Sequence, residues 1–173
     1  KTYEEIVGNS PASGDFYDAE MLTLVWETTP EAIEKLLPPP LKPAQKPVVL
    51  AFVATYPSTN FSLPYQESAL LIRASFEGQE GFYSLSMPVT NDMAMAGGEK
   101  YGANQEAGEI ALQREGDTVE SCIERHGIQS GSYTHLRAHE TRHEIVCRLL
   151  LEIKNFYITL YFNKQLINIH KSP

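Results

Sequence analysis

Two strand-like runs joined by a short glycine-containing connection constrain this chain most strongly. Residues 68–76 and 82–89 are rich in strand-forming side chains, and Glu77-Gly78-Gln79-Glu80-Gly81 joins them. A short glycine-rich connection between two such runs is typical of a β-hairpin. Residues 110–114 and 118–125 repeat the arrangement around residues 115–117. The sequence therefore predicts a mainly antiparallel sheet.

The segments before residue 60 predict two further strands and a short helix. Residues 21–26 are rich in strand formers, and residues 48–56 are almost continuously apolar, as in a strand covered on both faces. Between them, Thr28-Thr29-Pro30-Glu31 offers a capping hydroxyl, a proline suited to the first turn and a glutamate three residues after Thr28. Prolines 38–40 end this helix. The predicted fold class is α+β, with mainly antiparallel β-structure.

The charge of the chain changes sign after residue 130. Residues 1–130 carry 19 acidic and 8 basic side chains, whereas residues 131–173 carry 3 acidic and 6 basic ones. An acidic domain argues against nucleic acid and anionic membranes as partners, because both require a basic surface. Two cysteines make no disulfide framework, and no long apolar run suggests a membrane span. We expect a cytoplasmic protein with a small ligand.

The segment between the two predicted hairpins, residues 91–106, is a candidate functional loop. Its glycines permit backbone conformations that other residues avoid, and loops on rigid scaffolds commonly carry function. A connection containing a short helix explains the same residues. Gly97-Gly98 completes no phosphate-binding signature, so we do not expect a nucleotide site.

Several of these pieces together resemble the acetoacetate decarboxylase family. They are Leu24-Val25-Trp26, residues 29–41, the run after Pro47, Tyr65-Gln66-Glu67 and the loop from Gly97 to Glu106, all in the family's order and spacing. The resemblance covers about residues 14–127, the front half of the family's domain. It implies a truncated β-barrel or sheet domain with short helices, whose complete form can be a homo-oligomer.

The family's chemistry depends on a lysine in this loop. That lysine forms an imine with the ketone of a 3-keto acid, and the protonated imine accepts the electrons released as carbon dioxide leaves, so no cofactor is expected. Burial and an adjacent cation keep the lysine neutral by lowering its pKa, an effect for which acetoacetate decarboxylase is itself the standard example. The family's loop usually reads Gly-Arg-Glu, a short variable stretch, a proline and two lysines.

This sequence departs from the family at those positions. Gly97-Gly98-Glu99 occupies the first part of the loop, while Gln105 and Glu106 fall on the two lysines. Neither side chain can form an imine, so the catalytic residue is unknown. Lys100 is in the same loop, but its position five residues before Gln105 would aim it elsewhere, and we interpret it as a solvated lysine.

Two of the three remaining positions that the resemblance assigns to the site are also altered. The family's arginine near the first strand falls on Ala19, its first glutamate falls on Phe52, and its second glutamate is retained as Glu67. Glu67 is either an acid or base remaining in a ligand pocket or an exposed carboxylate on a strand edge. The possible ligand-pocket residues are Ala19, Phe52, Glu67, Gly98 and Glu99, with no metal ligand among them.

Three functions fit these residues. The first is a domain that binds or acts on a small keto acid or related carbonyl compound without imine chemistry; if active, it would be a carbon–carbon lyase. The second is a non-catalytic ligand-binding or structural domain. The third is a fragment of a working decarboxylase whose sequence contains errors at positions 105 and 106.

The last forty residues have a different character. His135, His139, His143 and Cys147 recur every four residues, but on one helix the first and last would lie about 18 Å apart, too far to share a metal ion. A second interpretation covers the same segment. Ser132 to Thr141 reads as one frame of a transposase-type sequencing adapter over ten consecutive residues. We therefore expect a partial domain over residues 1–130 and a non-native tail over residues 131–173.

Overall fold

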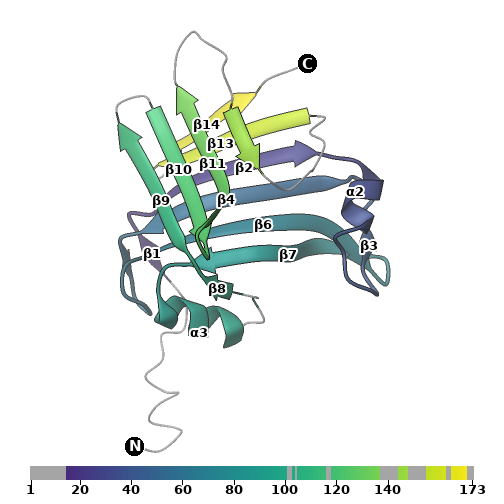
Figure 1. Cartoon of the computed structure of the whole chain (residues 1–173), viewed down its shortest axis with the longest axis horizontal. Helices are drawn as coiled ribbons and strands as arrows, with labels where there is room; N and C mark the ends of the chain where they lie inside the picture. Colours follow the sequence, from purple (N-terminus) through teal and green to yellow (C-terminus); the bar gives the residue numbers. More distant parts are fainter. Residues whose placement is uncertain are drawn as a thin grey trace, which may run out of the picture.

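The computed structural model describes residues 15–100, 103, 105–115, 118–136, 144–147, 155–162 and 165–170, with side chains described as far as residue 129 except for Lys100. Its main sheet contains eight strands (Figure 1). Seven follow the order β14 (Gln165–His170), β13 (Asn155–Phe162), β2 (Glu20–Glu27), β4 (Val48–Tyr56), β6 (Tyr65–Phe76), β7 (Gln79–Val89) and β8 (Gln105–Ala107). The eighth, β3 (Lys42–Pro43), pairs with β6.

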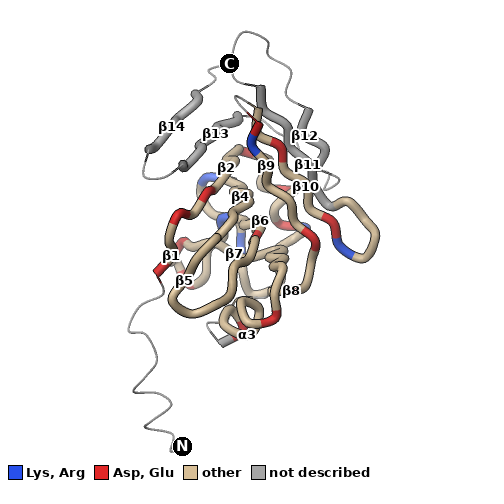
Figure 2. The backbone as a smooth tube through the Cα atoms, turned by 90° about the vertical axis from the view of Figure 1, so that its left-hand side faces the viewer, with Lys and Arg blue, Asp and Glu red and all other residues tan. Residues whose placement is uncertain are grey.

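A second sheet crosses one side of the main sheet, as Figures 1 and 2 show. Its order is β12 (Glu144–Cys147), β11 (Ile128–Leu136), β10 (Thr118–Arg125) and β9 (Glu109–Glu115). The short strands β1 (Phe16–Tyr17) and β5 (Ser58–Thr59) form a separate pair. Two helices complete the described chain, α2 (Pro30–Glu34) and α3 (Asp92–Lys100).

The predicted α+β, mainly antiparallel fold class is confirmed. Every described strand pairing is antiparallel except β7 with β8. The resemblance allowed a barrel or a sheet, and the described residues form an open sheet that does not close into a barrel, since β14 and β8 are its two edges. Both predicted hairpins are present as β6–β7 and β9–β10.

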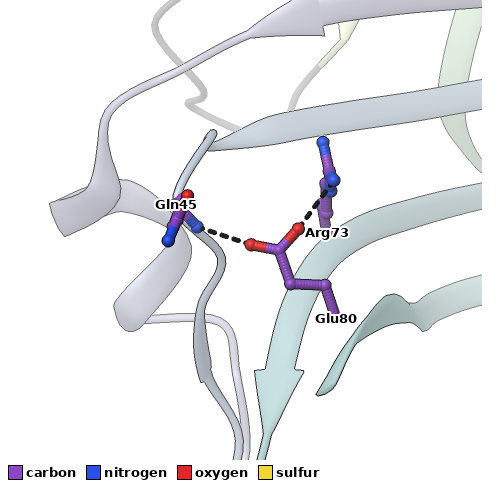
Figure 3. A network of polar contacts seen from close by, with 3 residues as sticks. All are labelled: Gln45, Arg73 and Glu80. Carbon is purple, nitrogen blue, oxygen red and sulfur yellow. Dashed lines mark hydrogen bonds and ion pairs between the residues drawn. The ribbon is translucent and has the colours of Figure 1, made fainter. Parts of the chain in front are cut away.

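The β6–β7 hairpin turns more tightly than the sequence suggested. Its strands extend to Phe76 and from Gln79, so only Glu77 and Gly78 remain in the turn. Both have positive φ, 50° and 81°, which matches the twist of the flanking strands and is easily adopted by glycine. Glu80 then ties the turn to the preceding chain, because its carboxylate accepts from Arg73 at 2.6 Å and from the backbone N–H of Gln45 at 3.0 Å (Figure 3).

The predicted helix is present, but its cap is one residue later than expected. Thr29, and not Thr28, accepts a hydrogen bond from the backbone N–H of Ala32, and Pro30 occupies the first helical position. The α-helix ends at Glu34, and Leu37 follows it into the core beside Ile33. Thr28 is buried instead, with its backbone N–H donating to Pro47.

The two faces of the main sheet carry different cores. Because side chains alternate along a strand, Leu22, Leu24 and Trp26 share one face and pack with Val49 and with Val119 of the second sheet. The opposite face carries a cluster of buried residues that we call the tyrosine cluster: Ala54, Tyr56, Tyr65, Val89 and Ala94. Ala94 belongs to α3, which lies at the β8 edge of the main sheet (Figure 1).

Candidate functional site

Gln105 and Glu67 meet although 38 residues separate them in the sequence. Glu67 lies on β6, opposite Val89 of β7, and Gln105 on β8 is paired with Met87 of β7. The Gln105 Nε2 amide donates to Glu67 Oε1 at 3.4 Å and lies 3.7 Å from the sulfur of Met87. Gln105, one of the two residues that the resemblance aligns with the family's lysine pair, therefore contacts Glu67.

The other end of the Gln105 amide is buried without a partner. Gln105 Oε1 accepts no hydrogen bond from the described residues. The orientation of the amide is chemically consistent, because Nε2 faces two acceptors, the Glu67 carboxyl group and the Met87 sulfur. The site thus presents a hydrogen-bond acceptor that a ligand or a water molecule would satisfy.

Gly98 of α3 makes room for this amide. A Cβ atom added at Gly98 would collide with the Gln105 side-chain amide, whereas one added at the neighbouring Gly97 would meet nothing within 4 Å. Any larger residue at position 98, including the arginine of the usual family pattern, would have to displace Gln105. The glycine at 98 and the glutamine at 105 are therefore sterically matched.

Burial dominates the electrostatics of Glu67. Removal from water raises the pKa of this carboxyl group, while hydrogen bonds from Gln105 and from the Tyr65 hydroxyl act in the opposite direction. The pKa values of Tyr65 and Tyr56 are raised above their ordinary range, first by burial and then by the negative charge of Glu67. Burial is the largest of these effects on Glu67.

Four of the five predicted pocket residues lie at or beside this pair. Ala19 and Phe52 are half-buried and pack against the tyrosine cluster, and Gly98 contacts Gln105. Glu67 is half-buried on a strand flanked on both sides, so its interpretation as an exposed edge carboxylate is wrong. Glu99 is exposed on α3.

Glu106 points to the opposite face of β8 and is fully engaged there. Its Oε2 forms an ion pair with Arg125 of β10 at 2.6 Å, and its Oε1 accepts from the Ser86 hydroxyl at 2.8 Å. Gln105 and Glu106 therefore belong to different environments. Only Gln105 lies with Glu67.

Three residues of the site were not predicted from the sequence. Tyr65 and Tyr56 flank the carboxyl group, with ring centroids 4.9 Å apart, and Met87 contacts the Gln105 amide. Tyr65 was recognisable, because it stands two residues before Glu67 on a strand and so shares its face. Met87 depends on the parallel pairing of β8 with β7, for which the sequence carries no signal.

A separate hollow lies away from these residues. It has a volume of about 290 Å³ and is lined by Leu41, Phe76 and Tyr83 among others, at the far end of β6 from Glu67. Its lining includes no residue of the candidate site.

Among the described helices, none has the length and hydropathy needed to cross a membrane.

Comparison with known proteins agrees with the resemblance seen in the sequence. The family model described as acetoacetate decarboxylase matches residues 5–143. The acetoacetate decarboxylase of Chromobacterium violaceum is 33% identical over 115 residues, which cover 66% of this chain and 46% of that protein. Acetoacetate decarboxylase 1 of Bradyrhizobium diazoefficiens is 27% identical over 140 residues, covering 80% and 56% of the two chains.

Solved structures give the same result for the fold. A structure from a study of acetoacetate decarboxylase superposes with a TM-score of 0.65 at 24% identity, covering 77% of this chain and 55% of the other. The acetoacetate decarboxylase of Legionella pneumophila gives 0.64 at 20% identity, covering 88% and 67%. The chain spans about half the length of the curated relatives it matches. On the extent of the family match, this chain belongs to the acetoacetate decarboxylase family.

Proposed function

We propose that this domain binds a small carbonyl compound of the keto-acid type without forming an imine with it. The contact between Gln105 and Glu67 carries the proposal. A primary amide is not nucleophilic enough to condense with a ketone, so the group beside Glu67 can donate and accept hydrogen bonds but cannot replace the family's amine.

The surroundings of positions 105 and 106 support these residues as functional and not as sequence errors. Gly98 leaves the space that the Gln105 amide fills, and Arg125 with Ser86 satisfies the carboxylate of Glu106. A glutamine and a glutamate placed at random would not be expected to find matched partners on both faces of one strand. This argument favours ligand binding over decarboxylation by a working lysine pair.

Reductive trapping tests the absence of imine chemistry. The protein is incubated with acetoacetate and borohydride, and its mass is then measured. We expect no adduct for the natural sequence or for Glu106→Lys, because position 106 faces away from Glu67. Gln105→Lys should give an adduct, since it puts an amine beside Glu67. An adduct on the natural sequence would overturn the proposal.

The cellular location and the assembly of the complete protein are also proposals. We infer a cytoplasmic protein that can assemble into a homo-oligomer, in keeping with its acidic composition and its family. Size-exclusion chromatography with light scattering tests the assembly. A purely monomeric species at micromolar concentration would contradict it.

We further propose that residues 131–173 are adapter-derived and contribute nothing to ligand binding. The proposal rests on the ten-residue match from Ser132 to Thr141 and on the change in charge after residue 130. Pairing of β13 with β2 does not bear on this origin, because an apolar segment of any origin can pair with a sheet edge. Resequencing the gene from its source provides the test, and a genomic origin of these codons would refute it.

A further inference from the structure

The described candidate site contains an acidic group and no basic one. Its ionisable side chains are Glu67, Tyr65 and Tyr56, and burial is the largest influence on the pKa of Glu67, followed by two hydrogen bonds. The positions where the family resemblance would put positive charge hold Ala19, Gly98 and Gln105. Arg125 of β10 forms an ion pair with Glu106 on the opposite face of β8.

This charge distribution disfavours the keto-acid anion. A ligand carboxylate entering the site would lose water and gain no described cation in return, and it would also meet the Glu67 carboxyl group. An uncharged ligand of the same size avoids both costs. The half-buried Phe52 and Met95 beside the tyrosine cluster suit its apolar part.

The unpartnered Gln105 Oε1 adds a second requirement. A buried acceptor left without a donor costs free energy, so a ligand that donates an N–H or O–H to this oxygen gains more than a ligand that only accepts. At the other end of the amide, Nε2 donates to Glu67, so Oε1 of Gln105 points away from the Glu67 carboxyl group. Acetoacetate at neutral pH offers acceptors only, whereas its amide offers two N–H groups.

We infer that the site takes an uncharged β-keto compound bearing a hydrogen-bond donor, such as a β-keto amide or an enol, in preference to the β-keto acid anion. The inference rests on the proposed function and names its ligand class. Acetoacetamide and acetoacetate are matched probes, because they share the carbon skeleton and differ only in the terminal amide or carboxylate. The geometry predicts selectivity at that terminal group.

Calorimetric titration of the full chain with both probes at neutral pH tests this selectivity. We expect acetoacetamide to bind about tenfold or more tightly than acetoacetate. Gln105→Met removes the acceptor at nearly constant length, so it should weaken acetoacetamide about tenfold and abolish the preference for acetoacetamide over acetoacetate. Gly97→Ala is the matched control, with open space around the added methyl group, and should keep the natural preference.

The outcomes separate the inference from the proposed function. Binding of acetoacetate as tight as that of acetoacetamide, or tighter, would refute the ligand class while leaving a carbonyl-binding domain in place. If acetoacetate does bind tightly and the Lys100→Gln variant loses that binding, Lys100 is the cation that holds the acetoacetate carboxylate. Failure of both probes to bind a folded, cooperatively melting protein would refute the proposed function itself. An unchanged preference in Gln105→Met would show that Oε1 does not determine the selectivity.

Discussion

Gln105 and Glu106 are neighbours in sequence, yet they occupy opposite environments. Gln105 faces the tyrosine cluster, where one end of its amide contacts Glu67 and the other end has no described partner. Glu106 faces the second sheet, where Arg125 and Ser86 satisfy both of its oxygens. The alternation of side chains along β8 produces this difference.

Gln105 is therefore available for binding a ligand, whereas Glu106 stabilises the structure. An ion pair whose members are 41% and 20% exposed, with a further hydrogen bond to Ser86, has little left to offer a ligand. An amide with an unused acceptor beside a buried carboxyl group has unmet hydrogen-bonding capacity. A similar contrast in packing occurs on β2, where Leu22 is fully buried and the preceding Met21 is half-buried.

The largest expected effect tests that contrast in packing on β2. Leu22 is buried against Val49 and Val119, whereas Met21, the preceding residue, faces the tyrosine cluster and is half-buried. We expect Leu22→Ala to lower the free energy of unfolding by about 2–5 kcal/mol, through lost burial and a residual cavity. Met21→Ala should cost roughly half as much, in proportion to the smaller area removed from water.

Urea unfolding monitored by the fluorescence of Trp26 measures both variants. Equal losses at the two positions would show that the tyrosine-cluster face is packed as tightly as its opposite. The idea of a binding face on the main sheet would then lose its support from packing.

A smaller effect is expected at the two glycines of α3. Gly98→Ala should force the Gln105 amide away from Glu67 and weaken acetoacetamide binding about tenfold, or about 1.4 kcal/mol. Gly97→Ala should leave binding unchanged, because nothing lies within 4 Å of the added methyl group. It should also raise the free energy of unfolding by about 0.5–1 kcal/mol, the usual advantage of alanine over glycine in a helix. Parallel titrations and melts of the two variants provide the measurement.

The sequence predicted the sheet well because its signals are local. Glycine connections, strand-forming runs and Thr29-Pro30 act within a few residues, and β2, β4, the two hairpins and the start of α2 appear where they were expected. The resemblance left a barrel or a sheet open, and the described strands form an open sheet, because closure depends on which strand edges meet. Such pairings are long-range properties that no local pattern encodes.

The candidate site was predictable only in part. The family resemblance identified Glu67 and Gln105 as positions of interest, and the structure brings them together. The match between Gly98 and Gln105 could not be foreseen, because it depends on how α3 turns back onto β8. Likewise, the burial of Glu67 follows from the order β4-β6-β7, which is set by pairing across the whole sheet.

The smallest expected effect compares the two carboxylates by removing the charge of each. Burial raises the pKa of Glu67, so the folded state binds its proton more tightly than the unfolded state does. The ionised group therefore opposes folding: its penalty is absent below the ordinary glutamate pKa and grows as pH rises through the raised value. Glu67→Gln should consequently be at least as stable as the natural sequence at neutral pH, and this advantage should disappear toward about pH 4.

Glu106→Gln should have the opposite sign, because it removes an ion pair and leaves Arg125 without its partner. The expected loss is about 0.2–1 kcal/mol at neutral pH, a small value because Arg125 is partly exposed and solvent screens the pair. Thermal melts of both variants from about pH 4 to about pH 8 give the two signs in one experiment. A stabilised Glu106→Gln together with a destabilised Glu67→Gln would reverse the roles of the two faces, and Glu67 would then be the carboxylate that holds the fold together.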